Sequence, residues 1–147
     1  MEDLARNKRA YFDYEILEKF EAGIELLGFE VKAIKSGQVN LGGSYVIVRG
    51  GEAYLINADI PPYQPLNTPE GYDSKRNRRL LLKKDEISSL IGKAEERGLT
   101  LLPLRVYSKH SFIKVEIGLG KSRKKKDKRD LLKKRADLRE IRAAKRR

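Results

Sequence analysis

Side chains that catalyse reactions or bind metals are scarce in this 147-residue chain. It has no Cys and a single His, His110, which lies in a predicted polar turn. A hydrolytic triad or a His-based metal site therefore has no partners to draw on, and thiol chemistry is excluded. The acidic residues follow no motif, and the glycines of 36–44 and 49–52 lack the spacing of dinucleotide or P-loop sites. We expect no enzyme activity, no cofactor and no metal.

Basic residues are abundant instead, and they gather at one end. The chain carries 33 Lys and Arg against 21 Asp and Glu, a net charge of +12. Residues 121–147 hold 15 of the basic and 4 of the acidic residues, so residues 1–120 are close to neutral. A block of this density predicts a polyanionic partner, because neutralising phosphates releases their counterions. Nucleic acid and an anionic membrane both fit this charge.

Two smaller basic clusters lie at 6–9 and 75–84. The first precedes aromatic residues that could stack on unpaired bases, and the second runs directly into "LLL". The alternative is that the second cluster is a solubilising loop and that the aromatic residues belong to the core. The auxiliary RNA-binding candidates in these clusters are Arg6, Lys8, Arg9, Phe12, Arg76, Arg78 and Arg79.

The apolar pattern of residues 1–120 predicts one α+β, mainly β, domain. We expect a strand over 11–26, a helix over 28–37, a hairpin over 44–60, a mobile Pro-rich loop over 61–79, a helix over 85–98 and two strands over 99–120. Gly37 and Gly98 should end the two helices, and Pro103 suggests an edge or a bulge. Short strands without regular strand–helix alternation favour an antiparallel sheet or small barrel, a class that includes oligonucleotide-binding folds.

Residues 121–147 form a separate basic tail in this interpretation. Leu131, Leu138, Ile141 and Ala144 follow helical spacing, but this apolar stripe is narrow. Helix nucleation is costly, so we expect the tail to be disordered when free and helical on a polyanion. A tail that stays disordered when bound is the alternative. No window approaches the roughly 18 apolar residues of a membrane span, and the N-terminus lacks a signal-peptide core, so we expect a cytoplasmic protein.

Several ordered motifs resemble one known family. They are "ARNKRA", "FEAGIELLGFEVKAIKSGQVNL", "LLLKKDEI", "LIGKAEERGLTLLPLRVY" and, in the tail, "DKRD". Together they closely resemble the small protein B, or SsrA-binding protein, family, the partners of transfer-messenger RNA (tmRNA) in bacterial rescue of stalled ribosomes. The resemblance implies a small oligonucleotide-binding-like barrel with flanking helices that grips the tRNA-like domain of this RNA. It also implies a tail that folds as a helix in the empty messenger channel, at the decoding centre of the small subunit.

The resemblance also implies which residues contact the RNA. Glu21 in "FEAG" matches an acidic RNA-contacting residue, which can accept a hydrogen bond from a base amino group or a 2′-hydroxyl. The full set that it implies for tmRNA binding is Tyr14, Glu21, Tyr45, Leu81, Lys83, Lys114, Lys121, Arg123 and Lys124. In the tail, the residues implied to probe the ribosome are Lys126, Asp127, Lys128, Arg129, Lys133, Lys134 and Arg135.

Three positions depart from the family pattern. Phe12 stands where His is frequent, which replaces a hydrogen bond by stacking. Lys83 stands where Asn or His is common, which suggests a phosphate contact. Lys126 precedes "DKR" at a position that often holds a stacking residue, so stacking on ribosomal RNA is lost there.

The expected function is that of a non-enzymatic, monomeric RNA-binding factor that delivers tmRNA to stalled ribosomes. A nonspecific basic RNA chaperone or ribosome-associated structural protein is the alternative, to be separated by competition with bulk tRNA. A membrane role for the tail is less favoured, because the tail has no Trp or Phe to anchor at an interface.

Overall fold

A computed structural model of the chain describes residues 2–145, and the side chains of residues 3–142. In sequence order its elements are β1 (Glu2–Arg6), α1 (Lys8–Asp13), β2 (Tyr14–Ile24), α2 (Gly28–Lys35), β3 (Tyr45–Arg49), β4 (Glu52–Ile56), a 3-10 turn (Pro65–Asn67), β5 (Arg78–Leu81), α3 (Lys84–Arg97), β6 (Thr100–Lys109), β7 (Phe112–Ser122) and α4 (Lys125–Lys145).

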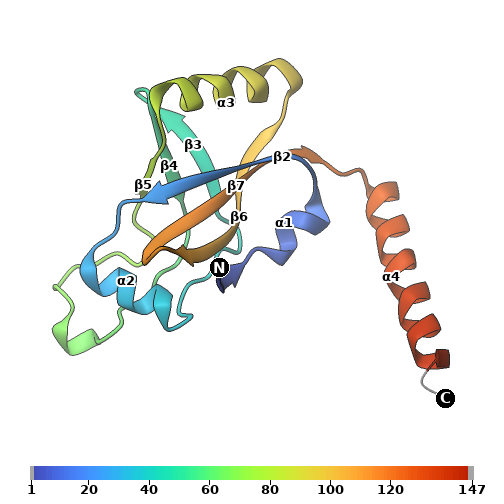
Figure 1. Cartoon of the computed structure of the whole chain (residues 1–147), viewed down its shortest axis with the longest axis horizontal. Helices are drawn as coiled ribbons and strands as arrows, with labels where there is room; N and C mark the ends of the chain where they lie inside the picture. The colour runs from blue at the N-terminus through green and yellow to red at the C-terminus, as the bar shows by residue number, and fades with distance from the viewer. Residues whose placement is uncertain (1, 146–147) are drawn as a thin grey trace.

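The described strands form one antiparallel sheet in the order β1-β6-β7-β2-β5-β4-β3. The long strands β6, β7 and β2 make its centre (Figure 1). The predicted antiparallel α+β class is therefore confirmed. Strand β3 comes close to β6, since Tyr45 and Leu101 line one shallow hollow, but no hydrogen-bonded ladder joins them among residues 2–145. The sheet thus curls without the ladder that would close a barrel.

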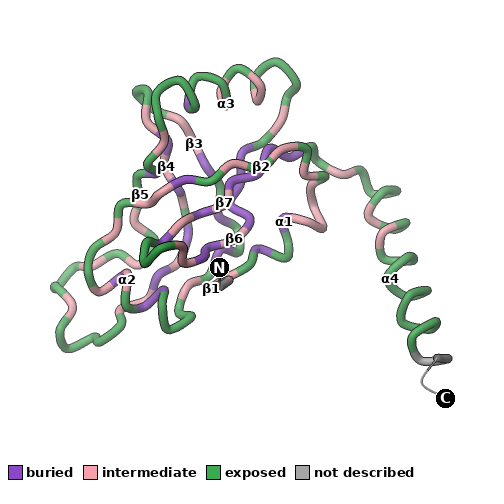
Figure 2. Tube along the Cα trace, viewed as in Figure 1, coloured by how far each residue is buried: buried purple, intermediate pink, exposed green. Residues whose placement is uncertain are grey.

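The core lies inside this curled sheet, where Leu80, Val115 and Ile117 are fully buried. Helix α2 adds Ile34 and helix α3 adds Leu90 to the same cluster, so both helices are fixed by burial of one apolar face. Figure 2 shows buried residues along the central strands and exposed ones along the outer side of α3 and along α4.

Local signals in the sequence located most elements correctly. Gly37 and Gly98 follow α2 and α3 with φ of +82° and +63°, a conformation that glycine adopts at low cost. The predicted hairpin over 44–60 is present as β3 and β4, in which Tyr45 pairs with Ile56. Next to Pro103 the register of β6 shifts, and β6 is not an edge strand, so of the two predicted alternatives the bulge is confirmed.

The strand predicted over 11–26 is β2, and it begins later than predicted, because residues 11–13 belong to α1. Asn7 starts this helix: its side chain accepts from Ala10 N (3.3 Å) and donates to Pro103 O (2.9 Å). Its backbone N–H also donates to Leu104 O (2.8 Å). The buried cap overrides the β propensity of the aromatic residues that follow.

Helix α4 extends away from the sheet (Figure 1). In this structure the tail is helical over Lys125–Lys145, and its disorder in the free protein stays a prediction. Leu138 and Ile141 are each more than half exposed, so the predicted apolar stripe exists but has no covering partner among the described residues. None of the described helices has the length and apolar content required to cross a membrane.

Candidate nucleic-acid interface

Glu21 lies near the middle of the open, outward face of the sheet. It stands on β2 opposite Glu116 of β7, and its neighbour Ala22 points into the core. Successive side chains of a strand point to opposite faces, which directs Glu21 to solvent. Its side chain is 39% exposed.

The Glu21 carboxylate is held by two residues of β6. The Tyr107 hydroxyl donates a hydrogen bond to Oε2, and Lys109 Nζ lies 3.3 Å from the same oxygen. The Tyr107 hydrogen bond lowers the pKa of Glu21 below its ordinary value. Burial opposes this effect, and Lys109 and the charge of Lys114 support it. Glu21 is thus an ionised acceptor at neutral pH.

A shallow apolar hollow adjoins Glu21. Gly23 pairs with Leu81 on one side and with Lys114 on the other, so the structure brings these two predicted residues together. Leu81 leans over Gly23, where an added Cβ would lie 3.2 Å from the Leu81 Cβ. Phe112, which is 68% exposed, lines the same hollow, and Lys114 Nζ lies 5.9 Å from its ring centroid.

Sequence reasoning missed Phe112, Tyr107 and Lys109. The signal for Phe112 was present, because residues 112, 114 and 116 alternate with buried ones along β7 and so share the outward face. Tyr107 could not be found this way. It is almost fully buried, and only the pairing of β6 with β7 brings its hydroxyl to Glu21.

Tyr14 and Tyr45 form a second group with Arg9 around a different hollow. Tyr14 is seven residues from Glu21 along β2, roughly 20 Å away at the usual rise of a strand. The predicted tmRNA-binding residues therefore fall into two groups. Lys83, two residues beyond Leu81 in the chain, is the exposed N-cap of α3.

The start of the tail lies beside α1. Lys121, Arg123 and Lys124 line one hollow with Lys134. The backbone N–H of Arg123 donates to Asp13 O (2.9 Å), which ties the exit of β7 to the end of α1. The structure thus brings the three predicted residues together and places Lys134 of α4 near them.

The first turns of α4 dock on α1. The Asp13 carboxylate lies 3.0 Å from both Arg9 Nε and Lys128 Nζ. Burial opposes ionisation of Asp13, but the contacts with Lys128 and Arg9 prevail and lower its pKa. The Phe12 ring faces Arg9, Lys128 and Arg135 at 5.1, 5.7 and 6.0 Å. Phe12 is therefore a platform for cations in this structure.

The remaining tail candidates are exposed. They are Lys126, Asp127, Arg129, Lys133 and Lys134. Asp127 Oδ2 accepts from Lys124 N (3.2 Å) and so satisfies one free N–H at the start of the helix. Among the auxiliary candidates, Lys8 is exposed, and Arg6 is exposed but paired with Asp3 at 2.5 Å.

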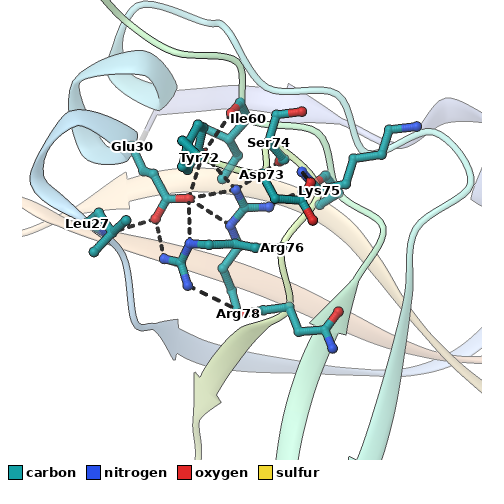
Figure 3. Close-up of polar contacts among 11 residues, drawn as sticks. Leu27, Glu30, Ile60, Tyr72, Asp73, Ser74, Lys75, Arg76 and Arg78 are labelled. Atoms are coloured by element: carbon teal, nitrogen blue, oxygen red, sulfur yellow. Dashed lines mark hydrogen bonds and ion pairs between the residues drawn. The ribbon is translucent and has the colours of Figure 1, made fainter. Parts of the chain in front are cut away.

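The interpretation of Arg78 as an RNA-contacting residue is wrong. Its side chain is 0% exposed and donates to Glu30 Oε2 through Nη2 (2.6 Å) and Nε (3.0 Å), and to Ser74 O (2.9 Å) (Figure 3). Arg76 pairs with the same carboxylate, and Tyr72 donates to it at 2.8 Å. This cluster joins α2 to the end of the Pro-rich loop and is structural.

Glu30 remains charged in this buried position. Burial alone would raise its pKa, but hydrogen bonds from Arg76, Leu27 N, Arg78 and Tyr72 lower it to about 2. Burial and the hydrogen bond to Glu30 in turn raise the pKa of Tyr72 to about 12. Arg79, the last of this group, points outward and pairs with Glu25 at 3.1 Å.

Comparison with known proteins decides the family. The family described as "SmpB protein" matches residues 4–147, nearly the whole chain. The chain belongs to the SmpB family. The SsrA-binding protein of Microcystis aeruginosa is 52% identical over 135 residues, 92% of this chain and 88% of its own length. That of Gloeothece citriformis is 50% identical over 138 residues, 94% and 89% of the two chains.

A solved structure agrees with this assignment to the SmpB family. A chain from the structure called "tmRNA-SmpB: a journey to the center of the bacterial ribosome" matches with a TM-score of 0.68 and 44% identity, over 82% of this chain and 85% of that one. The predicted family is therefore confirmed by sequence and by fold.

Proposed function

We propose that this chain binds tmRNA and delivers it to stalled ribosomes for trans-translation, without catalysing a reaction itself. The observation that carries the proposal is the 44% identity and shared fold with a chain of a tmRNA–SmpB ribosome structure. Ribosomes are cytoplasmic, so the expected site of action is the cytoplasm.

The open face of the sheet is the proposed surface for the tRNA-like domain. Glu21 accepts hydrogen bonds from a base or a 2′-hydroxyl, which a phosphate cannot donate, and so contributes specificity. Lys114 and Lys83 supply charge, and the exposed ring of Phe112 offers a stacking surface beside Leu81. A second region, around α1, extends this surface to the start of the tail. It contains Tyr14, Tyr45, Lys121, Arg123 and Lys124.

Residues 121–147 form the proposed second functional unit, beside the body of residues 1–120. Beyond Arg135, the described part of α4 makes no ion pair with the body and adds no residue to its core, so the stability of the helix there rests on its own helix propensity. An isolated helix of this length and charge is marginal in water. We propose that the tail unfolds in part when free and becomes fully helical in the messenger channel, guided by Lys126, Arg129 and Lys133.

Truncation after Lys124 separates the two surfaces, because it leaves β7 complete. We expect the truncated protein to bind the isolated tRNA-like RNA with nearly unchanged affinity in a gel-shift or calorimetric titration. Tagging on ribosomes that lack messenger should be abolished in a reconstituted translation system. Loss of RNA binding together with tagging would contradict the two-surface proposal.

A nonspecific RNA chaperone is the second candidate, favoured by the net charge of +12. Bulk tRNA separates the two, because it displaces a nonspecific binder at a concentration similar to that of the tRNA-like RNA. We expect a large excess of bulk tRNA to be needed, and a smaller dependence on salt for the specific RNA than purely electrostatic binding gives.

A further inference from the structure

A row of contacts crosses four strands of the open face and ends at Glu21. Asp3 of β1 accepts from Arg105 Nη1 (2.6 Å), and Glu116 of β7 accepts from Arg105 Nη2 (3.2 Å). The Arg105 guanidinium lies 4.2 Å from the centroid of the Tyr107 ring. The hydroxyl of Tyr107 then donates to Glu21 Oε2. The proposed RNA-binding carboxylate is thus the last member of an ordered series.

Tyr107 has little freedom to move within this series. Only 2% of it is exposed, since Arg105 covers its ring. A buried phenol requires a hydrogen-bond partner, and Glu21 is the partner present. Burial and the Glu21 hydrogen bond raise the pKa of Tyr107. Its hydroxyl therefore remains a proton donor throughout the physiological range.

Arg105, which covers the Tyr107 ring, is itself held by ion pairs. Two carboxylates, Asp3 and Glu116, bind its two terminal nitrogens in different directions. These contacts raise the pKa of Arg105 further, led by the hydrogen bond that it donates to Asp3. A guanidinium held in one plane is suited to stacking on an aromatic ring.

This arrangement commits one oxygen of Glu21 and leaves the other accessible. Oε2 accepts from Tyr107, whereas Oε1 has only Lys109 Nζ, at 3.4 Å. An unconstrained Glu side chain loses rotamer freedom on binding, which lowers affinity. Fixing the carboxylate before binding removes most of that cost.

We propose that Tyr107, supported by Arg105, is a positioning residue that holds Glu21 ready to accept hydrogen bonds from the donor edge of an unpaired base or from a 2′-hydroxyl. The inference rests on the proposed binding of RNA by this face. Tyr107 is buried, so it acts through Glu21 and does not itself contact the RNA.

Replacing Tyr107 by Phe removes the hydroxyl and keeps the ring. We expect the affinity for the isolated tRNA-like RNA to fall roughly two- to tenfold, because the hydrogen bond that orients the Glu21 carboxylate is lost. The matched control is Tyr72→Phe, which removes a hydroxyl from the Glu30 cluster and should leave RNA affinity unchanged. Equal losses in both variants would overturn the proposal.

The free protein provides a readout that does not depend on RNA. In Tyr107→Phe, the pKa of Glu21, followed by NMR of labelled carboxyl groups, should rise toward its ordinary value. Lys109, Lys114 and Glu116 also face Glu21 and remain in place in this variant. An unchanged Glu21 pKa would show that Tyr107 does not hold the carboxylate, and would overturn the proposal even if RNA affinity fell.

A double-mutant cycle separates this inference from the proposed function. In a Glu21→Ala background, Tyr107→Phe should change RNA affinity by less than twofold, because the group it positions is gone. Additive losses would contradict positioning through Glu21. If Glu21→Ala alone leaves RNA affinity unchanged, the proposed RNA site on this face fails, and the inference with it.

Discussion

Two carboxylates in this molecule have the same kinds of partner and different exposure. Glu30 and Glu21 each accept a hydrogen bond from a tyrosine and lie beside basic side chains. Glu30 is fully buried and receives six hydrogen bonds from four residues, so no capacity remains for a ligand. Glu21 is partly open, and one of its oxygens is nearly free. Exposure decides which cluster holds the fold together and which can recognise a partner.

The largest effect should come from Glu30→Ala. Removing this carboxylate leaves Arg78 buried and unpaired, which costs about 3 to 5 kcal/mol of unfolding free energy. Urea unfolding measures it. The matched control is Glu25→Ala, which breaks an exposed pair with Arg79 and should cost less than about 1 kcal/mol. Similar losses in both variants would remove the distinction between buried and open clusters.

Glu21→Ala should have the opposite profile, with weaker RNA binding and a loss of stability clearly smaller than that of Glu30→Ala, about 1 to 3 kcal/mol for the unpaired Tyr107 hydroxyl. Removing a charged acceptor of a hydrogen bond predicts an affinity for the tRNA-like RNA lowered about ten- to a hundredfold. Calorimetric titration gives the affinity, and urea unfolding gives the stability. The control is Glu25→Ala, at the position directly after β2. This variant should bind the tRNA-like RNA with the affinity of the unchanged protein. A stability loss as large as that of Glu30→Ala would make Glu21 structural.

Acid should weaken the Glu30 cluster. The pKa of Glu30 is lowered from 4.5 to about 2, so its contribution is fully present above pH 4.5 and is lost as the pH falls toward 2. We expect a loss on the order of 2 kcal/mol over this window. Asp3, Asp13 and Glu21 have lowered pKa values too, so the comparison is with Glu30→Gln. The variant should lose less stability between pH 5 and about 3 than the unchanged protein; an identical pH profile would contradict the assignment.

The smallest effect should come from Asp13→Asn, at the contact between α1 and α4. This change removes an ion pair with Lys128 and should cost less than about 1 kcal/mol. Hydrogen exchange should show faster exchange in the first turns of α4 and unchanged exchange in β2 and β7. Asp137→Asn, at an exposed position of the same helix, should have no such effect. Faster exchange in both variants would show that α4 is not held at Asp13.

Local sequence signals were sufficient for most of the fold. Glycine permits the left-handed backbone conformation found at Gly37 and Gly98, and Pro103 has no backbone N–H to donate to a neighbouring strand. These properties do not depend on the surrounding residues. The open edges of the curled sheet could not be predicted, because barrel closure depends on whether β3 and β6 pair, and they are distant in sequence. The α1 helix was missed since its cap, Asn7, is satisfied by backbone groups at Pro103 and Leu104.

The two carboxylate clusters show where sequence reasoning ends. The run of basic residues at 75–84 predicts that Arg78 lies at the surface, although Arg78 shares the inward side of β5 with Leu80. Glu30 likewise shares the buried face of α2 with Ala33 and Ile34, at helical spacing. Both signals exist, but the pair is separated by 48 residues and only the fold brings it together. Glu21 was found through family resemblance, and Tyr107 required the strand register.

An NMR titration with the tRNA-like RNA observes both carboxylates in one sample. With glutamate side chains labelled at the carboxyl carbon, one equivalent of RNA should shift the Glu21 resonance and leave that of Glu30 in place. A shifted Glu30 resonance together with a static Glu21 resonance would contradict the assignment of Glu21 to recognition and of Glu30 to the fold.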